Sequence, residues 1–309
     1  MNKICVIDGS HLAFRNLIAH AYLGVGRIKT GVTYGFLKSL LKIDREFKVG
    51  MDNMVVCWDF GKSDWRLRLY PEYKAGRAKG DIDITSYRDQ LKMLREALEL
   101  LGVAQFGVQG VEADDLIGIL SNRYYKEGSK VLVYSGDQDM YQLVKDEEPG
   151  VVVIKPPNND VLMEQDILRI TGVLPKQIPD FKALVGDKSD NIQGVKGVGK
   201  VKAARLLKDY KCLEVLLEVF KDQKGLIESL KVQERYREEM NNLKDGKLLL
   251  NKKITTILRD SDKEALTENQ IFTIDNWVRD ITNKDRDKFV DLLRSLNMIS
   301  LLSDFFEVL

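Results

Sequence analysis

The stretch Val131-Leu132-Val133-Tyr134-Ser135-Gly136-Asp137 is a short apolar run of strand-favouring residues that ends in a turn and a carboxylate. The same order occurs in Val55-Val56-Cys57-Trp58-Asp59 and from Ile4 to Asp8. Apolar runs of this kind, alternating with segments in which apolar residues recur every three or four positions, are typical of βαβ units. The sequence therefore predicts an α/β fold with a mainly parallel central sheet.

The expected elements follow from this alternation. Strands are expected over residues 4–7, 54–58, 103–106, 131–134 and 151–154, and helices over residues 32–47, 87–101 and 111–125. From residue 166 the strand signals fade, and helices separated by Gly and Pro follow. We expect an α/β domain over residues 1–180 and a helical domain over residues 181–309.

The amino-acid composition limits the class of protein but does not indicate a binding partner. The 309 residues include 48 Lys and Arg and 47 Asp and Glu, a formal net charge of +1. The cysteines Cys5, Cys57 and Cys212 have no CxxC spacing, which indicates reduced side chains. The N-terminus enters a strand directly, and no apolar run is long enough to cross a membrane. We therefore expect a soluble cytoplasmic protein.

Carboxylates recur where the apolar runs end. Because a parallel sheet gathers the carboxyl ends of its strands at one edge, these side chains are expected to converge there. A hard divalent cation neutralises such a cluster, and Mg²⁺ or Mn²⁺ prefers carboxylate oxygens and water. One carboxylate of the run 112–115 is expected merely to place favourable charge at a helix N-terminus. The pattern indicates a metal-dependent phosphoryl-transfer enzyme. The carboxylates are Asp8, Asp59, Glu112, Asp114, Asp115, Asp137, Asp139, Asp187 and Asp190.

Three acidic motifs carry a resemblance to a known family. Val-Glu-Ala-Asp-Asp at 111–115, Ser-Gly-Asp-Gln-Asp-Met at 135–140 and Gly-Asp-Lys-Ser-Asp-Asn at 186–191 resemble those of the 5′-nuclease (flap endonuclease) superfamily. This family includes the 5′-nuclease domain of bacterial DNA polymerase I and stand-alone bacteriophage 5′ exonucleases of the RNase H type. Residues 7–10, 30–35 and 70–77 are similar to further family motifs in the same order. The resemblance covers residues 4 to about 210 and implies a PIN-like sheet.

The resemblance also implies roles for the carboxylates. Asp8, Glu112, Asp114 and Asp137 are expected to hold one Mg²⁺ or Mn²⁺, with Asp59 close to it. Asp115, Asp139, Asp187 and Asp190 are expected to serve a second ion, directly or through water. Two such cations activate water and stabilise the leaving oxygen of a phosphodiester, so no protein nucleophile is needed. We expect Asp8 and Asp137 to be essential for catalysis, and His11 and His20 to be structural.

A basic stretch with interleaved aromatic residues lies between residues 60 and 80. A solvated surface loop is the plain alternative, but phosphates attract Lys and Arg while unpaired bases stack on aromatic rings. In the family that the chain resembles, this segment begins a helical arch, here about residues 62–85. Lys74 and Arg77 match the family's active-site cations. Tyr73 is expected either to stack on a nucleotide or to pack against the sheet.

The stretch Gly194-Val195-Lys196-Gly197-Val198-Gly199-Lys200 fits the GxxxxGK spacing of a nucleotide-binding P-loop. Val201 lacks the hydroxyl that such a loop needs, and residues 187–193 are too polar for the preceding strand. A dinucleotide-binding motif fails for the same missing strand. The segment instead resembles the family's helix-hairpin-helix, about residues 191–208, whose amides approach a DNA phosphate and whose carbonyls are a candidate K⁺ site. The residues expected to grip duplex DNA are Lys196, Gly197, Gly199, Lys200, Lys202 and Arg205.

The C-terminal tail ends in Phe305-Phe306, which suggests either docking on a sliding clamp or packing of a last helix on its own domain. We favour the packed helix.

The functional hypothesis is a monomeric, structure-specific 5′ nuclease with 5′–3′ exonuclease and flap endonuclease activity. It is expected to act in replication, repair or recombination on branched or flapped duplex DNA and RNA/DNA with a free 5′ end. Removal of RNA primers in the manner of RNase H is included. The chain has no room for a polymerase, so the nuclease is expected to stand alone. Replication proteins such as a single-strand-binding protein or a clamp are candidate partners. The alternatives are a non-catalytic branched-DNA-binding protein and a PIN-like ribonuclease.

Overall fold

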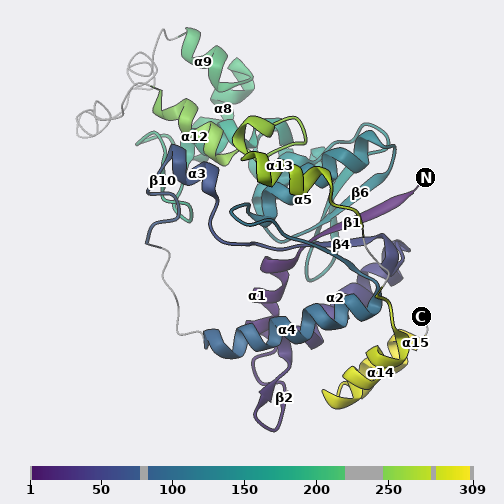
Figure 1. The fold of residues 1–309 in the computed structure, drawn as a ribbon. Coiled ribbons are helices and arrows are strands. Elements are labelled where there is room, and N and C mark those ends of the chain that lie inside the picture. Colours follow the sequence, from purple (N-terminus) through teal and green to yellow (C-terminus); the bar gives the residue numbers. More distant parts are fainter. Residues whose placement is uncertain (1, 77–82, 220–245, 280–282, 307–309) are drawn as a thin grey trace.

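The computed structural model describes residues 2–76, 83–219, 246–279 and 283–306. A six-stranded sheet with the strand order β5-β4-β1-β6-β7-β8 lies at its centre (Figure 1). Neighbouring strands run parallel except for the pair β7 and β8. The expected mainly parallel α/β fold is therefore confirmed. The strands are β1 (Lys3–Asp8), β4 (Met54–Cys57), β5 (Ala104–Phe106), β6 (Lys130–Tyr134), β7 (Val151–Lys155) and β8 (Asp160–Leu162).

Helices surround the sheet and continue beyond it. The α-helices of the described residues are α1 (Gly9–Ala19), α2 (Gly31–Phe47), α3 (Asp64–Leu69), α4 (Ile84–Leu101), α5 (Ala113–Lys126), α6 (Glu164–Thr171), α7 (Ile178–Val185), α8 (Lys200–Tyr210), α9 (Leu213–Val219), α12 (Lys247–Thr255), α13 (Glu268–Asp275), α14 (Arg286–Ser295) and α15 (Ile299–Phe306). Short 3₁₀ helices are η1 (Met51–Asn53), η2 (Gln138–Leu143), η3 (Pro175–Gln177) and η5 (Lys263–Ala265). Two small hairpins complete the set: β2 (Gly24–Val25) with β3 (Ile28–Lys29), and β9 (Gly186–Asp187) with β10 (Ile192–Gln193).

Several observed elements have no counterpart among the expected ones, including α1, the hairpin of β2 and β3, and β8. Helix α1 buries Leu12 and Ala13 but exposes Phe14 and Ile18, so its apolar residues lie on both faces and conceal the helical period. The hairpin of β2 and β3 has only two residues in each strand. Strand β8 is three residues long and exposes Val161, so it carries too little pattern to be recognised.

The two faces of the sheet bury alternate residues of each strand, as the side-chain period of two requires. Ile4 and Val6 of β1 lie in a core with α5, whereas Cys5 and Ile7 lie in a core with α1, α2 and α4. Helices α14 and α15 pack on this second side, against α4 and α2 respectively (Figure 1). The chain therefore returns to the first half of the molecule at its C-terminus.

The proposed domain division between residues 180 and 181 falls inside α7. Helices α7, α8, α9 and α12 pack together into a helical region that follows the sheet. Residues 286–306 were expected in that helical domain, yet α14 and α15 lie on the sheet domain. Their amphipathic pattern predicts that they pack somewhere, but it does not say against what.

The strand register brings three carboxylate-bearing turns to one edge of the sheet. Asp8 at the end of β1 pairs with Cys57 of β4, and Ile7 pairs with Tyr134 of β6. The residues that follow these strands therefore lie side by side. A Cβ on Gly9 would lie 2.6 Å from the Val56 side chain, so the start of α1 can approach β4 this closely only with glycine at this position.

No helix among the described residues is long and apolar enough to span a membrane.

Candidate active site

Five of the expected carboxylates line one pocket of about 840 Å³ at the carboxyl edge of the sheet. They come from the last residue of β1, from the turns after β4 and β6, and from the start of α5 with the residue before it. The structure thus brings together the whole set proposed for the first metal ion, although these residues lie far apart in sequence. The five are Asp8, Asp59, Glu112, Asp114 and Asp137.

Serine and backbone donors fix the orientation of this cluster. The Ser135 hydroxyl donates to Asp8 Oδ2 over 2.8 Å and accepts the Asp137 amide over 3.1 Å, so it ties two carboxylate turns together. One Asp59 oxygen accepts the amide of Ala113, the first residue of α5, over 2.8 Å. Asp59 therefore satisfies a free amide of that helix, a role expected of one member of the run 112–115.

Burial raises the proton affinity of two carboxylates in this cluster, Asp8 and Asp114. Burial is the main cause that raises the pKa of Asp8 to about 6, with a smaller contribution from Asp59. Burial, followed by repulsion from Asp8 and Asp137, raises the pKa of Asp114 well above its usual range. Asp8 and Asp114 are buried and lie close to each other, so a bound cation would favour the ionised form of both at neutral pH.

Lys74 supplies one fixed positive charge to the cluster. Its ammonium donates to Glu112 Oε1 over 2.7 Å and lies 3.9 Å from Asp190 Oδ1. Burial opposes the charge, but the attraction of Glu112, Asp190 and Asp114 is larger and raises the pKa of Lys74. The backbone of Lys74 has φ of 54°, an uncommon left-handed conformation for a non-glycine residue.

Tyr73 is packed into the site and is not presented to solvent. Its ring is 5% exposed, and its hydroxyl lies 3.1 Å from Glu112 Oε2 and 3.3 Å from Asp190 Oδ2. This geometry favours the packing alternative over stacking on a nucleotide. Arg77 lies outside the described residues.

A second acidic cluster lies beside the first. Asp139, Asp187 and Asp190 each place an oxygen within 4.8 Å of the others, and they line an adjoining pocket of about 530 Å³. The Lys182 ammonium lies in this cluster and donates to Asp139 and, over 2.7 Å, to Asp187. Burial raises the pKa of Asp139 to about 6 despite Lys182. For Asp187, burial is the largest single effect, but the ion pair with Lys182 and the hydrogen bonds from Ser189 together outweigh it and lower the pKa to about 2.

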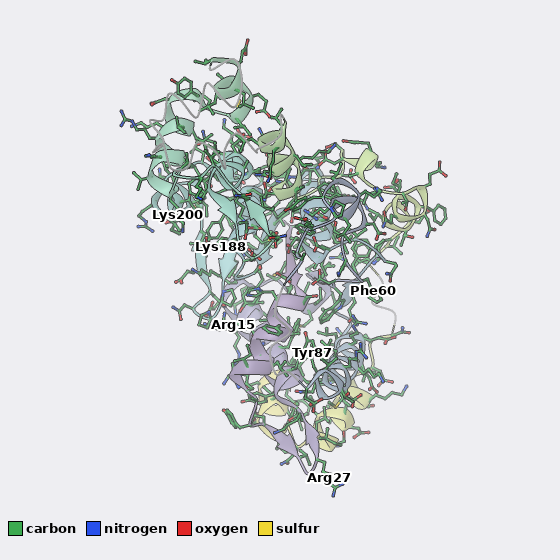
Figure 2. All side chains as sticks on the ribbon, turned by 90° about the vertical axis from the view of Figure 1, so that its left-hand side faces the viewer. Arg15, Arg27, Phe60, Tyr87, Lys188 and Lys200 are labelled. Carbon is green, nitrogen blue, oxygen red and sulfur yellow. The ribbon has the colours of Figure 1, made fainter. Side chains whose placement is uncertain are left out.

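The glycine-rich stretch at residues 194–200, called the glycine turn below, lies between α7 and α8. Two buried valines hold it in place. Val195 donates its amide to the Leu184 carbonyl over 2.7 Å, and the Val198 amide donates to Val195. Gly197 has φ of 83°, which this tight turn requires. Lys200, Lys202 and Arg205 are exposed on α8, and Figure 2 shows Lys188 and Lys200 on one flank of the molecule.

The residues around this turn do not form a P-loop. The strand before it, β10, has only two residues and pairs with β9, so no buried parallel strand leads into the turn. Val201 stands at the position of the missing hydroxyl and is largely exposed.

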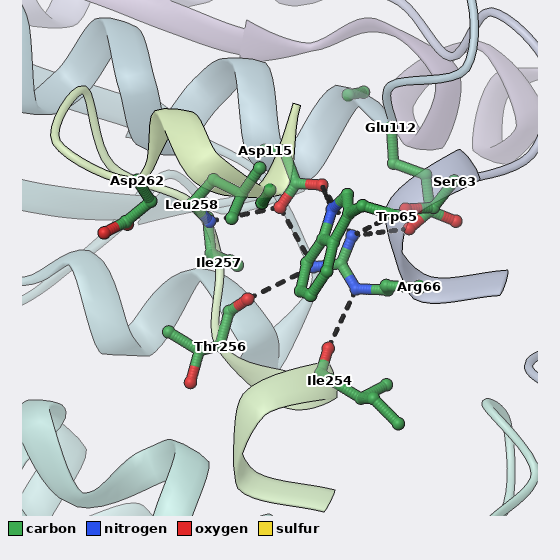
Figure 3. Close-up of polar contacts among 12 residues, drawn as sticks. Ser63, Trp65, Arg66, Glu112, Asp115, Ile254, Thr256, Ile257, Leu258 and Asp262 are labelled. Atoms are coloured by element: carbon green, nitrogen blue, oxygen red, sulfur yellow. Dashed lines mark hydrogen bonds and ion pairs between the residues drawn. The ribbon is translucent and has the colours of Figure 1, made fainter. Parts of the chain in front are cut away.

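Asp115 differs from the other expected metal ligands. It is fully buried, and both its oxygens accept hydrogen bonds from the Arg66 guanidinium, one of them over 2.9 Å (Figure 3). Trp65 Nε1 donates to it over 3.0 Å, and the Leu258 amide over 3.1 Å. Because four donors already occupy its two oxygens, we leave Asp115 out of the proposed metal set.

Arg66 connects this buried acid to the active site and to the C-terminal region. It also donates to Glu112 Oε2 over 3.0 Å and to the Ile254 carbonyl over 2.8 Å (Figure 3). The sequence marked Arg66 only as one cation of a basic stretch. Its pairing with Asp115 could not be predicted, because Asp115 lies forty-nine residues later in the chain and nothing in the sequence around Arg66 indicates this partner.

Three further residues belong to the site without having been expected there. Ser135 joins two carboxylate turns, and Lys182 lies in the second cluster. His11, expected to be structural, lines both pockets, and its amide donates to Asp8 Oδ1 over 3.0 Å. Ser135 lies inside the motif at 135–140, which is the one signal that could have singled it out.

Comparison with known proteins agrees with this geometry. Residues 3–172 match the family model of the 5′-3′ exonuclease N-terminal, resolvase-like domain, and residues 173–277 match that of the C-terminal SAM fold. A 5′-3′ exonuclease of Aquifex aeolicus is 32% identical over 305 residues, which covers 98% of this chain and 95% of that protein. DNA polymerase I of Bacillus subtilis is 33% identical over 266 residues, but the match covers 85% of this chain and only 28% of the polymerase.

Solved structures share the fold at low sequence identity. The T5 D15 protein co-crystallised with metal ions has a TM-score of 0.65 at 18% identity, covering 96% of this chain and 99% of that one. The catalytic core of Rad2 in complex with DNA substrate has a TM-score of 0.52 at 17% identity, covering 96% and 88%. The expected family is confirmed by the matches in sequence. With both of its domain models matched in order along residues 3–277, the chain belongs to the 5′-3′ exonuclease family.

Proposed function

We propose that this chain is a divalent-metal-dependent, structure-specific 5′ nuclease that hydrolyses phosphodiesters near the 5′ end of a nucleic-acid strand. The observation that carries the proposal is the convergence of two carboxylate clusters, from turns spread over residues 8–190, at one edge of the sheet. Family membership supports the same reaction class.

The residues present fit a pair of hard divalent cations. The candidate ligands are Asp8, Glu112, Asp114 and Asp137 for one ion, with Asp59 beside them, and Asp139, Asp187 and Asp190 for the other. Two ammonium groups, of Lys74 and Lys182, already lie among these oxygens, which shows that the clusters attract positive charge. When bound, the metal ions supply an activated water and stabilise the leaving oxygen. Mg²⁺ or Mn²⁺ is the proposed identity, because the candidate side-chain ligands are all oxygens.

The protein side chains position the phosphodiester. Lys74 is held at the border of the two clusters by Glu112 and Asp190, where its charge can stabilise the phosphate as negative charge develops. Arg77, three residues later, is proposed to assist it. Ser135 and Asp59 keep the carboxylate turns in register, so little rearrangement of the ligands is needed during the reaction.

The glycine turn is proposed to hold the duplex beside the cut. Lys196, Lys200, Lys202 and Arg205 present positive charge around the backbone of Gly197 and Gly199, a combination that binds phosphates regardless of base sequence. The turn carbonyls are the proposed K⁺ site. The Rad2 core, which shares this fold, was solved in complex with a DNA substrate.

The proposed substrates are branched or flapped DNA and RNA/DNA duplexes with a free 5′ end. We further propose a cytoplasmic monomer that acts in replication or repair. A replication protein such as a clamp or a single-strand-binding protein is a candidate partner.

A 5′-labelled flap on duplex DNA tests the function, with wild type and Asp137→Asn, in Mg²⁺, in Mn²⁺ and with a chelator. We expect short labelled products from the wild type with metal only, and at least a hundredfold slower cleavage by Asp137→Asn. If the wild type cleaves the flap with neither metal, the proposed function is wrong and the alternative of a non-catalytic branched-DNA-binding protein is favoured. Cleavage of single-stranded RNA in preference to the flap would favour the PIN-like ribonuclease.

A further inference from the structure

A guanidinium without an anionic partner lies in the pocket that holds the first carboxylate cluster. Arg95, on α4, lines this pocket of about 840 Å³ together with Asp8, Asp59 and Asp137. Among the described residues, no hydrogen bond or ion pair involves its guanidinium, and its Nε atom is buried without a hydrogen-bond partner. An arginine left this way in a partly buried position is costly, since burial alone lowers its pKa.

Aromatic rings hold this arginine in place. Its guanidinium carbon lies 5.0 Å from the ring centre of Trp58 and 5.2 Å from that of Phe60. The Trp58 ring is itself fixed, because its Nε1 donates to Gln105 over 3.1 Å and Gln105 donates to the Arg95 carbonyl over 2.9 Å. Stacking on rings restricts the guanidinium without using its N–H donors. The planar group is therefore ready to bind a ligand.

The other lining residues indicate what the ligand is. Lys62 and Lys74 add positive charge to the pocket, and Phe14 and Tyr87 add aromatic rings. The Phe14 side chain is 44% exposed, so its ring is accessible. Cations next to accessible rings match a nucleotide unit, with a phosphate for the cations and a base for a ring.

We propose that Arg95 binds a backbone phosphate of the unpaired 5′ strand, next to the scissile phosphate and on its 5′ side. In Figure 2, Lys200 of the glycine turn lies on the left flank together with Lys188, whereas Phe60 lies toward the right and Tyr87 lies lower, near the middle. A strand that runs from the glycine turn across the carboxylates reaches Arg95 after the metal site. The inference rests on the proposed function, because it takes the carboxylate pocket to be where the strand is cut.

Arg95→Met tests the inference, because methionine keeps an unbranched side chain on the rings and removes the charge. Affinity for a short 5′ flap is measured by fluorescence anisotropy in the presence of a chelator, so that binding is read without cleavage. The flap carries either normal linkages or a neutral methylphosphonate at one of the first three linkages 5′ of the cut. Arg88→Met on the same helix is the matched control, since Arg88 is exposed and does not line this pocket.

We expect Arg95→Met to weaken flap binding roughly tenfold, the scale of one charge-assisted hydrogen bond, and Arg88→Met to change it little. A methylphosphonate at one of the three linkages is expected to lower the flap affinity of the wild type by a similar factor and to leave the flap affinity of Arg95→Met unchanged. Arg95→Lys keeps the charge but not the planar guanidinium, and its flap affinity is expected to lie between those of wild type and Arg95→Met. Thermal unfolding of each variant checks that the fold is intact.

Equal affinities of Arg95→Met and Arg88→Met would overturn the inference, as would a methylphosphonate penalty of the same size in Arg95→Met and wild type at every position. Wild-type cleavage of the same flap in Mg²⁺ is measured separately. An uncleaved flap refutes the proposed function, whereas a cleaved flap with normal binding by Arg95→Met refutes only the role of Arg95.

Discussion

Lys182 donates to Asp187 over 2.7 Å inside the second acidic cluster, and the same ammonium also donates to Asp139. A side-chain cation thus occupies the position where two of the candidate metal ligands converge. A divalent ion that binds these oxygens has to compete with an ammonium that is already attached to them.

Removal of this ammonium should therefore strengthen metal binding. We expect Lys182→Met to bind Mn²⁺ at the weaker of two sites on the order of tenfold more tightly than wild type, because no charge-assisted hydrogen bond has to be broken first. Isothermal titration calorimetry measures affinity and stoichiometry without a substrate. Lys188→Met is the control, since Lys188 lines the same pocket but is exposed. Weaker or unchanged Mn²⁺ binding by Lys182→Met would show that Lys182 does not compete.

The ion pair of Arg66 and Asp115 should dominate the stability of the region between the sheet and the C-terminal helices. Arg66→Met leaves Asp115 buried and unpaired, and we expect a loss of about 3–5 kcal/mol in the free energy of unfolding. Urea denaturation measures this loss. Arg68→Met on the same helix removes one exposed hydrogen bond, to the Ala265 carbonyl, and should cost about 1 kcal/mol or less. Similar losses in the two variants would contradict the importance given to the buried pair.

Lys74 and Lys200 should differ in the kinetic constant that each one controls. Lys74 lies among the carboxylates, so Lys74→Ala is expected to lower the single-turnover rate at least a hundredfold and to change duplex affinity little. Lys200 is exposed at the start of α8, so Lys200→Ala should chiefly weaken binding and reduce its salt dependence by about one phosphate contact. Single-turnover rates and salt titrations of affinity separate the two, and the reverse pattern would exchange their roles.

The metal-free protein should lose stability as the pH rises. Asp8 and Asp139 have pKa values of about 6 in the fold, against 3.8 for an unperturbed Asp, mainly because they are buried. Below about pH 4, the carboxyl groups of Asp8 and Asp139 are protonated in the folded and in the unfolded protein, so their burial does not lower the free energy of unfolding there. As the pH rises from about 4 to 6 the unfolded chain ionises first, and the folded state becomes less favourable. Thermal unfolding with a chelator should show this decline, and Mg²⁺ should reverse it above pH 6. A chelated protein whose stability rises over this interval would contradict the burial argument.

The two terminal phenylalanines should behave differently. Phe305 is 1% exposed and lies edge-on to Phe289, with ring centres 5.0 Å apart, whereas Phe306 is 53% exposed. Phe305→Ala is expected to cost about 3–5 kcal/mol of stability and Phe306→Ala less than about 1 kcal/mol. Chemical denaturation compares them. A binding assay with a sliding clamp, using Phe306→Ala, addresses docking separately, and loss of clamp binding without loss of stability would support the docking alternative.

The sequence by itself determined the sheet and the location of the chemistry. Apolar strands that end in carboxylates, such as residues 131–137, predict a parallel sheet, because the strand pattern is visible in a short stretch of sequence. They also predict an acidic edge, because parallel strands end at the same edge of the sheet. For this reason the expected first-cluster residues meet in one pocket.

Only the tertiary structure decided which charged side chains pair. Asp114 and Asp115 are neighbours in one helical turn, yet Asp114 faces the carboxylate pocket and Asp115 faces Arg66. Successive residues of a helix point in directions about 100° apart, so the choice depends on what packs against each face. The same holds for Lys182 between Asp139 and Asp187, and for Arg95 stacked on Trp58 and Phe60. Such pairings join residues that are distant in the chain and leave no periodic pattern, so they are fixed only when the whole fold brings the partners together.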